Sequence, residues 1–172
     1  RRDVVAIDSG GHFTSEVYQY ARERGRQGVI AIKGQSQRNK PPIGKPGKVD
    51  LNSKGRTLKK GAAVFPVGSD TIKTTLFARL KHNEPGDGFL HFHHETSLEY
   101  FEQLTAEKQV LRHNRGCFPI REWVKKPHAR NEALDCLVYA YAGLHHLYTR
   151  YDRRTIWDQF ERRLSGETKP RK

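Results

Sequence analysis

Two aspartates have the residue type and the surroundings of groups that do chemistry. Asp135 interrupts an apolar run that is expected to form a helix, and a buried carboxylate needs a partner charge, a metal ion or a shifted pKa. Asp8 follows a short apolar run, residues 4–7, at the kind of strand end where open α/β sheets place catalytic groups. Glu132 lies three residues before Asp135 and therefore shares its helical face.

Carboxylates gathered from such positions favour Mg²⁺ or Mn²⁺, because these hard cations prefer oxygen ligands. Two ions roughly 3.5–4 Å apart can activate a water molecule and stabilise the leaving oxygen in phosphodiester cleavage. We therefore predict Asp8, Asp135 and Glu132 as catalytic residues, with Asp8 and Asp135 as ligands of a two-ion site. Repulsion among these carboxylates should raise the pKa of one acid when no metal is bound.

Each acid also has a purely structural interpretation. Asp8 could be a turn residue before Ser-Gly-Gly, and Asp135 could pair with a core arginine or accept a hydrogen bond from a hydroxyl. Glu132 could support a metal ligand, or it could only pair with Arg130. The residues by themselves leave these alternatives open.

The charge of the chain indicates a polyanionic partner. It carries 32 Lys and Arg residues against 19 Asp and Glu, a net charge of +13, which favours DNA or RNA. Much of the excess lies in residues 34–60, which together with Lys33 hold nine basic residues, one acid and three prolines. We expect a mobile basic loop with a short ribbon near 48–51 and 57–60, either a solvated insertion or a DNA-contacting segment. The predicted nucleic-acid contacts are Lys33, Arg38, Lys40, Lys45, Lys48, Lys54, Arg56 and, further along the chain, Lys73.

Other reactive residue types have weaker contexts. His91 and His93 would alternate on a strand beside His94, but without a cysteine pair or an HExxH pattern zinc is not favoured. Cys117 and Cys136 lack CxxC spacing and are expected to be free, mostly buried thiols. The chain has no GxxxxGK[ST] motif, so ATP hydrolysis by these residues is not predicted.

Alternating strand and helix patterns predict one α/β domain over residues 1–172. A strand, a helix and a strand at the start form a βαβ unit, which implies parallel strands and a right-handed crossover. The expected helix caps are Thr14 or Ser15, Ser69 or Asp70, and Ser97. The predicted strands are residues 3–8, 29–33, 62–67, 89–93 and 120–125, and the predicted helices are 15–25, 71–81, 97–113, 130–149 and 158–164, the last within a charged C-terminal tail, 150–172.

The chain shows no sign of a membrane or secretory protein. No apolar run approaches the roughly 18 residues that would suggest a membrane span, and no signal peptide is visible. We therefore expect an intracellular protein without a membrane partner. The sequence contains no methionine, even at position 1, from which we expect a piece of a longer or processed chain.

Five segments occur together in one order: residues 6–14, 29–34, 67–73, 100–107 and 130–141. The last of them, Arg-Asn-Glu-Ala-Leu-Asp-Cys-Leu-Val-Tyr-Ala, is quite specific. Together the segments resemble the C-terminal nuclease domain of lambda-type phage terminase large subunits, over about residues 4–144.

The resemblance implies an RNase H-like fold with a central mixed sheet flanked by helices. It implies a Mg²⁺- or Mn²⁺-dependent endodeoxyribonuclease that cuts concatemeric viral DNA during genome packaging, with an ATPase motor upstream of this domain. It further implies double-stranded DNA as substrate, the terminase small subunit and the portal as partners, and the host cytoplasm as location.

By this resemblance Asp8 matches the family's middle acid and Asp135 its late helical acid. The family's first acid, on an earlier strand of an initial antiparallel set, has no match here, and we expect it before residue 1. Asp70 fits a helix cap better than that role, and Glu107 fits a salt-bridged helical residue. Two alternatives remain: another RNase H-like nuclease of the resolvase or integrase type, or a non-catalytic basic DNA-binding module with structural carboxylates.

Overall fold

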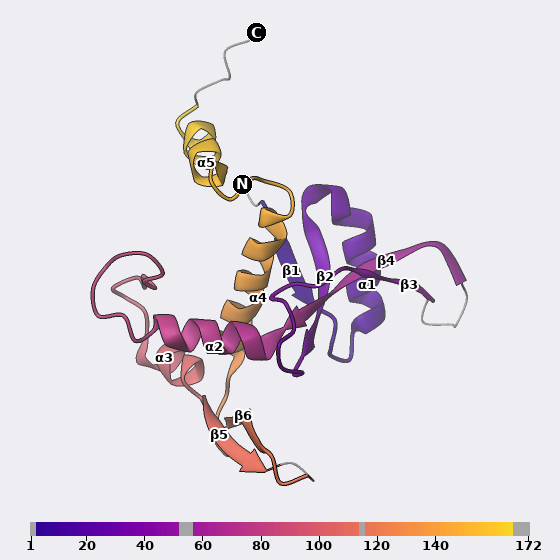
Figure 1. Cartoon of the computed structure of the whole chain (residues 1–172). Helices are drawn as coiled ribbons and strands as arrows, with labels where there is room; N and C mark the ends of the chain where they lie inside the picture. Colours follow the sequence, from indigo (N-terminus) through magenta and orange to yellow (C-terminus); the bar gives the residue numbers. More distant parts are fainter. Residues whose placement is uncertain (1–2, 52–56, 114–115, 167–172) are drawn as a thin grey trace.

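The computed structural model describes residues 3–51, 57–113 and 116–166, and its centre is a four-stranded sheet (Figure 1). The strands are β1 (Val5–Asp8), β2 (Val29–Gln35), β3 (Gly47–Leu51) and β4 (Thr57–Gly68), in the spatial order β1-β2-β4-β3. Strands β1, β2 and β4 are parallel, whereas β3 is antiparallel to β4. The mixed sheet flanked by helices is therefore confirmed.

The first two strands form the predicted βαβ unit. Helix α1 (Thr14–Arg24) and a 3-10 turn (Gly25–Gln27) connect β1 to β2, and Asp8 lies opposite Ile32 at the carboxyl end of the pair. The cap prediction was wrong, because Phe13 is the N-cap residue and no side chain caps the helix. The Thr14 hydroxyl instead donates back to the carbonyls of Ser9 and Gly11 (2.9 and 2.8 Å).

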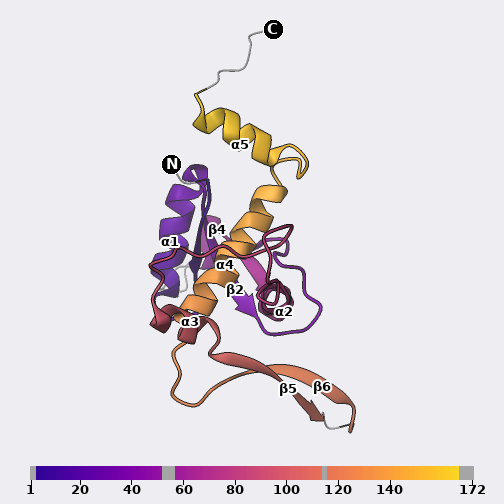
Figure 2. The same cartoon turned by 90° about the vertical axis from the view of Figure 1, so that its left-hand side faces the viewer.

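Each face of the sheet has its own apolar cluster, because alternate residues of a strand point to opposite sides. Helix α1 covers one face, where Ala21 packs with residues 29, 31 and 64. Helices α2 (Ser69–Arg79), α3 (Leu98–Leu104) and α4 (Glu132–Tyr148) cover the other, and Figure 2 shows α1 and α4 on opposite sides of the strands. The core of that second face is Ile30, Ile32, Val67, Ile72, Leu76, Leu104, Leu134, Val138 and Ala142.

Two elements extend away from this body (Figures 1 and 2). The antiparallel hairpin of β5 (Glu107–His113) and β6 (Pro119–Lys125) lies at one end, where Trp123 packs on Phe77 of α2 with ring centroids 4.6 Å apart. Helix α5 (Ile156–Leu164) lies at the other end and confirms the short terminal helix that was predicted within the tail.

The structure corrects the predicted helix over residues 97–113. Ser97 does cap α3, since its hydroxyl oxygen accepts from the Tyr100 amide at 3.3 Å. The helix ends at Leu104, however, and Glu107–His113 pairs with Pro119–Lys125 as a strand. The local sequence Glu-Lys-Gln-Val-Leu-Arg-His shows no clear period of either kind, so its long-range pairing with β6 decides that it forms a strand.

Three further expectations were wrong in part. Residues 34–60 are not a loop throughout, because they contain the end of β2, all of β3 and the start of β4, whose pairing confirms the short ribbon. Residues 89–93 form no strand. Helix α2 begins at Ser69 with Gly68 as its N-cap, so Ser69 and Asp70 lie in the first turn instead of capping it. No helix among the described residues is long and apolar enough to cross a membrane.

The chain between β2 and β3 is fixed tightly to the junction of β4 and α2. The Gly68 amide donates to the Pro41 carbonyl at 3.2 Å, and the Thr71 hydroxyl donates to the Lys40 carbonyl at 2.7 Å. A Cβ atom on Gly68 would lie 2.5 Å from both of these carbonyl oxygens. Backbone atoms cannot swing aside as side-chain ends do, so only glycine fits this position without a shift of the chain.

We expect Gly68→Ala to lower the free energy of unfolding by about 1–3 kcal/mol, the usual cost of overpacking. Gly47→Ala is the matched control, because a Cβ there meets no atom within 4 Å. The control should be neutral or slightly stabilising, since alanine has less backbone entropy to lose on folding than glycine. Urea denaturation of the two variants and the wild type checks this, and equal midpoints for the two variants would contradict it.

Candidate metal site and its surroundings

Asp8 and Asp135, far apart in the sequence, line the same cavity of about 520 Å³. Asp8 ends β1 on the sheet, and Asp135 lies in the first turns of α4, which packs along that strand. Glu132 and Tyr139 line the same cavity from α4. The structure therefore brings together all three acids that the sequence selected, and adds a tyrosine.

Asp8 is held by two donors. The Gly10 amide donates to its Oδ1 at 3.0 Å, which makes Asp8 the turn residue of the structural interpretation as well. The Tyr139 hydroxyl forms a hydrogen bond with the same carboxylate. A Cβ on Gly10 would lie 3.3 Å from Asp8 Oδ1, so the glycine leaves the carboxylate room. The turn and the tyrosine orient Asp8, and its remaining lone pairs are available to a cation.

Asp135 is not buried, contrary to the expectation from its apolar sequence context, because its side chain is 43% exposed. The apolar neighbours in the sequence point into the core, while Asp135 faces the cavity. Its Oδ2 accepts from Asn131 Nδ2 at 3.2 Å, and its Oδ1 lies 4.0 Å from Lys73 Nζ. The core-arginine partner considered for Asp135 is thus replaced by an asparagine and a lysine.

The pKa of Asp135 is raised, as predicted for one acid of the group. Partial burial is the main cause, and the negative charges of Glu107, Asp8 and Glu132 raise the pKa further. The Lys73 ammonium acts in the opposite direction. Asp135 thus lies where negative charge accumulates, and a bound cation would relieve that repulsion.

Glu132 differs from the other two acids. Its carboxylate accepts from Arg130 Nε at 3.3 Å, and its side chain is 60% exposed. A backbone hydrogen bond at the start of α4, helped by the Arg130 charge, lowers its pKa. The predicted pairing with Arg130 is therefore present, and the carboxylate also borders the cavity.

Tyr139 was missed by the sequence-based selection, although it lies one helical turn after Asp135 and so shares its face. Burial raises its pKa, and the charges of Asp8 and Asp135 raise it further. The hydroxyl therefore remains protonated at neutral pH and can donate. A Cβ on Gly34 would lie 3.3 Å from this hydroxyl, so the end of β2 also borders the tyrosine.

Glu107 and Lys73 form an ion pair beside this cavity, with Lys73 Nζ 2.7 Å from Glu107 Oε2. The expectation that Glu107 is salt-bridged is confirmed, but the residue starts a strand and is not helical. Lys73 was predicted to contact phosphate, and its ammonium is here engaged with a carboxylate. Asn131, which touches both Glu107 and Asp135, was not selected from the sequence.

A second cavity, of about 600 Å³, adjoins the first through these three residues. It is lined by Lys73, Glu107 and Asn131, by the basic side chains Arg38, Arg121 and Lys125, and by the acidic side chains Asp70 and Glu122. Arg38 was among the predicted nucleic-acid contacts, whereas Arg121 and Lys125 on β6 were not. Lys33, Lys45 and Lys48 are exposed, Lys40 is half-buried, and Lys54 and Arg56 lie outside the described residues.

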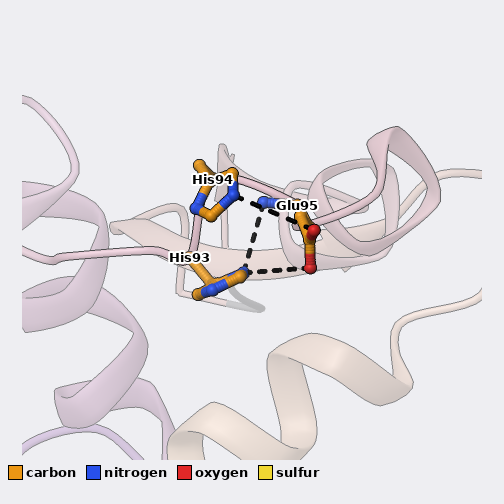
Figure 3. A group of neighbouring side chains, drawn as sticks. All are labelled: His93, His94 and Glu95. Carbon is orange, nitrogen blue, oxygen red and sulfur yellow. Dashed lines mark hydrogen bonds and ion pairs between the residues drawn. The ribbon is translucent and has the colours of Figure 1, made fainter.

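The carboxylate set suits a hard divalent cation, although the oxygens of Asp8, Glu132 and Asp135 do not all lie within 4.8 Å of one another. Within the described parts of the chain, the group that meets this distance is His93, His94 and Glu95, in the segment between α2 and α3 (Figure 3). All three are exposed, and His93 Nδ1 already accepts from the Glu95 amide at 3.3 Å. The predicted alternation of His91 with His93 is wrong, since no strand forms there.

Both cysteines are free, as predicted, but Cys117 and Cys136 are exposed and not buried. Cys136 follows Asp135 on the exposed side of α4 and lines the cavity of Asp8, Glu132 and Asp135 (the acid cavity).

Comparison with known proteins gives one family and two relatives. Residues 2–157 match the family described as terminase large subunit gpA, endonuclease domain. The chain is 35% identical over 147 residues to the terminase large subunit of Escherichia phage lambda. It is 35% identical over 148 residues to that of Enterobacteria phage P21. These alignments cover 81% of this chain but only 21% and 22% of the relatives, so the chain spans a small part of their length. No solved structure matches the chain.

The raised pKa of Asp135 predicts a pH-dependent stability effect in metal-free buffer. Because its folded-state pKa lies above the ordinary value of 3.8, the ionised carboxylate destabilises the fold at neutral pH, and this penalty disappears as the pH falls through the folded-state pKa. Asp135→Asn should therefore be more stable than the wild type at pH 7, by less than about 1 kcal/mol for a half-exposed group. The gain should shrink toward pH 4.

Thermal denaturation with a chelator present measures this difference. Asp158→Asn, on the exposed side of α5, removes the same charge and controls for the net charge of +13. A destabilised Asp135→Asn variant at pH 7, or a gain equal to that of the control, would contradict the expected electrostatic strain.

Proposed function

The chain belongs to the endonuclease-domain family of the terminase large subunit gpA, which confirms the resemblance seen in its segments, and on this premise we propose that it is a Mg²⁺- or Mn²⁺-dependent endodeoxyribonuclease. Its substrate would be double-stranded concatemeric viral DNA, cut in the host cytoplasm during genome packaging. The terminase small subunit and the portal are the proposed partners. We further propose that the domain is part of a longer chain with an ATPase motor before it.

The observation that carries the proposal is the shared cavity of Asp8 and Asp135. Two carboxylates from distant parts of the sequence, one with a raised pKa, are an unfavourable arrangement for a purely structural role. Oxygen ligands of this kind fit Mg²⁺ or Mn²⁺. One or two such ions bound there would supply the Lewis-acid chemistry of phosphodiester hydrolysis.

The side chains of the protein have separate tasks in this scheme. The Gly10 amide and Tyr139 orient Asp8, and Asn131 restrains Asp135, so both carboxylates keep a defined geometry. Glu132, held by Arg130, adds negative charge at the edge of the cavity without being fixed as a ligand. Tyr139 stays protonated and serves as a hydrogen-bond donor.

Basic residues of one continuous segment would hold the DNA backbone. Lys33, Arg38, Lys40, Lys45 and Lys48 follow one another from β2 to β3, and Lys54 and Arg56 continue the same segment in the sequence. Arg38 borders the second cavity, next to the acid cavity. Such contacts position DNA without reading its sequence. The family assignment favours a terminase nuclease over a nuclease of the resolvase or integrase type.

Asp8→Asn and Asp135→Asn should each reduce Mn²⁺-dependent nicking of plasmid DNA by more than about 100-fold, the upper range for losing a residue that only supports a metal ligand. DNA binding should persist, because the basic residues remain. Asp158→Asn serves as the control and should cleave like the wild type. The assay is run on this chain and on the longer polypeptide.

Two outcomes would contradict the nuclease proposal. If the wild type binds DNA but cleaves it in neither form, with Mn²⁺ or with Mg²⁺, the chain is the non-catalytic DNA-binding module. If cleavage survives Asp135→Asn, the cavity is not the catalytic site.

The basic segment predicts a change in salt dependence. Replacing Lys45 and Lys48 with glutamine should weaken DNA binding and reduce the slope of log K against log salt by about 0.9 per lost phosphate contact. Arg22 and Arg26, both exposed near the opposite end of the β1–β2 pair, give a control double variant with the same loss of charge. Fluorescence anisotropy across a salt series measures both slopes, and equal slopes in the two variants would show that the segment is only solvated.

A further inference from the structure

We propose that Glu107 and Asn131, together with Lys73, are positioning residues that fix the Asp135 carboxylate for the proposed metal-dependent reaction, so this inference rests on the proposed function. None of the three touches substrate in this scheme. They act through Asp135, from the side opposite the acid cavity: all three line the second cavity, whereas Asp135 lines the first.

Glu107 is the fixed point of the group. It is the first residue of β5 and only 7% exposed, and a buried carboxylate requires full compensation by donors. Lys73 Nζ lies 2.8 Å from its Oε1 and 2.7 Å from its Oε2. Asn131 Nδ2 donates to Oε1 as well, at 2.9 Å. Three short contacts from α2 and from the start of α4 leave this carboxylate little freedom.

Asn131 transmits this rigidity to Asp135. Its Nδ2 carries two hydrogens and donates to Glu107 Oε1 at 2.9 Å and to Asp135 Oδ2 at 3.2 Å. Both acceptors are carboxylates, so the amide group must face them with its nitrogen. The amide therefore spans the two acids and sets the distance between the fixed carboxylate and the half-exposed one.

The position of Asn131 makes this use of its side chain unusual. Asn131 is the N-cap residue of α4, where an asparagine normally accepts a hydrogen bond from the first turn of its own helix. Here it makes no such bond. The side chain of Gln103 in α3 takes over, since its Oε1 accepts from the Ala133 amide at 3.2 Å. Because a second residue caps the helix, Asn131 is free to donate to the two acids.

Lys73 completes the arrangement by facing the other carboxylate oxygen of Asp135, Oδ1. Its Nζ lies 4.0 Å from Asp135 Oδ1, and its side chain is only 12% exposed. The strong pair with Glu107 holds the ammonium at this distance from Asp135. Without Glu107 the same ammonium would be free to pair with Asp135 directly and to compete with a metal ion. Glu107 thus restrains Asp135 through Asn131 and keeps Lys73 away from it.

Two substitutions at one position separate this role from helix capping. Asn131→Ala removes both donations, and we expect Mn²⁺ affinity and kcat to fall by about 10- to 100-fold, the range for residues that orient a metal ligand. The KM for DNA should stay unchanged. Asn131→Asp also removes both donations, because a carboxylate only accepts, and should lose Mn²⁺ affinity as Asn131→Ala does. Capping alone predicts wild-type behaviour for Asn131→Asp, because aspartate caps a helix as well as asparagine.

The primary readout is the dissociation constant for Mn²⁺ alone, measured by electron paramagnetic resonance without DNA and below the melting temperature of every variant. Gln109→Ala is the matched control, since Gln109 Nε2 donates to Thr74 Oγ1 at 3.3 Å and so joins the same elements, β5 and α2, away from the acids. This control should bind Mn²⁺ like the wild type.

Glu107→Gln provides an independent arm. It should weaken Mn²⁺ binding by releasing Lys73 toward Asp135, and adding Lys73→Met in the same chain should restore part of the affinity. Wild-type Mn²⁺ affinity in Asn131→Asp, or an equal loss in Gln109→Ala, would overturn the positioning role. A wild type that neither binds Mn²⁺ nor cleaves DNA would instead overturn the proposed function, so the two failures are distinct.

Discussion

The packing of α4 along β1 is the contact on which the site depends. The two run in opposite directions: Asp135 at the start of the helix meets Asp8 at the end of the strand, and a Cβ on Gly143 would lie 3.2 Å from Val4 Cγ1 near the start of the strand. The eight residues from Asp135 to Gly143 rise about 12 Å in a helix. The four residues from Val4 to Asp8 rise about 13 Å in a strand. The matched lengths keep the helix and the strand in contact at both ends.

Helix α4 presents its core residues and its cavity residues on two adjoining faces. Leu134, Val138 and Ala142 are buried in the core at successive turns, with 0%, 1% and 0% exposure. Asp135 and Tyr139 each follow one of these residues and so occupy the adjoining stripe, which faces β1 and the cavity. A carboxylate in an apolar run is therefore tolerated because it lies at the border of the buried face. The remaining electrostatic penalty appears in the raised pKa of Asp135, and a cation bound in the cavity would relieve it.

The sequence pointed to Asp8 and Asp135, which share one cavity in the structure, and to the parallel βαβ unit, because both depend on local patterns. Asp8 ends an apolar run and Asp135 interrupts one, and the resemblance to terminases supported both. Asn131 and Tyr139 were not selected, and Glu107 was expected only as a salt-bridged helical residue, since the positions of all three depend on contacts made across the fold. Glu107 is an example: residues 105–113 were assigned to a helix, and only pairing with Pro119–Lys125 makes Glu107 the buried start of a strand. The exposure of Cys136 could not be predicted for the same reason, because the burial of a helical residue depends on which face of α4 packs on the sheet.

The two cavities differ in their charged residues, and Lys73, Glu107 and Asn131 lie between them. Acids alone, Asp8, Glu132 and Asp135, are the charged residues of one cavity, whereas the other has Arg38, Arg121 and Lys125 together with Asp70 and Glu122. Glu132 already pairs with Arg130 as an ordinary salt bridge. Lys73 instead pairs closely with Glu107, at 2.7 Å, and stays 4.0 Å from Asp135, while Asn131 donates to both acids. The pairing of Lys73 with Glu107 thus leaves the Asp135 carboxylate without a close cation of the protein, which is the state in which the proposed metal ion would bind.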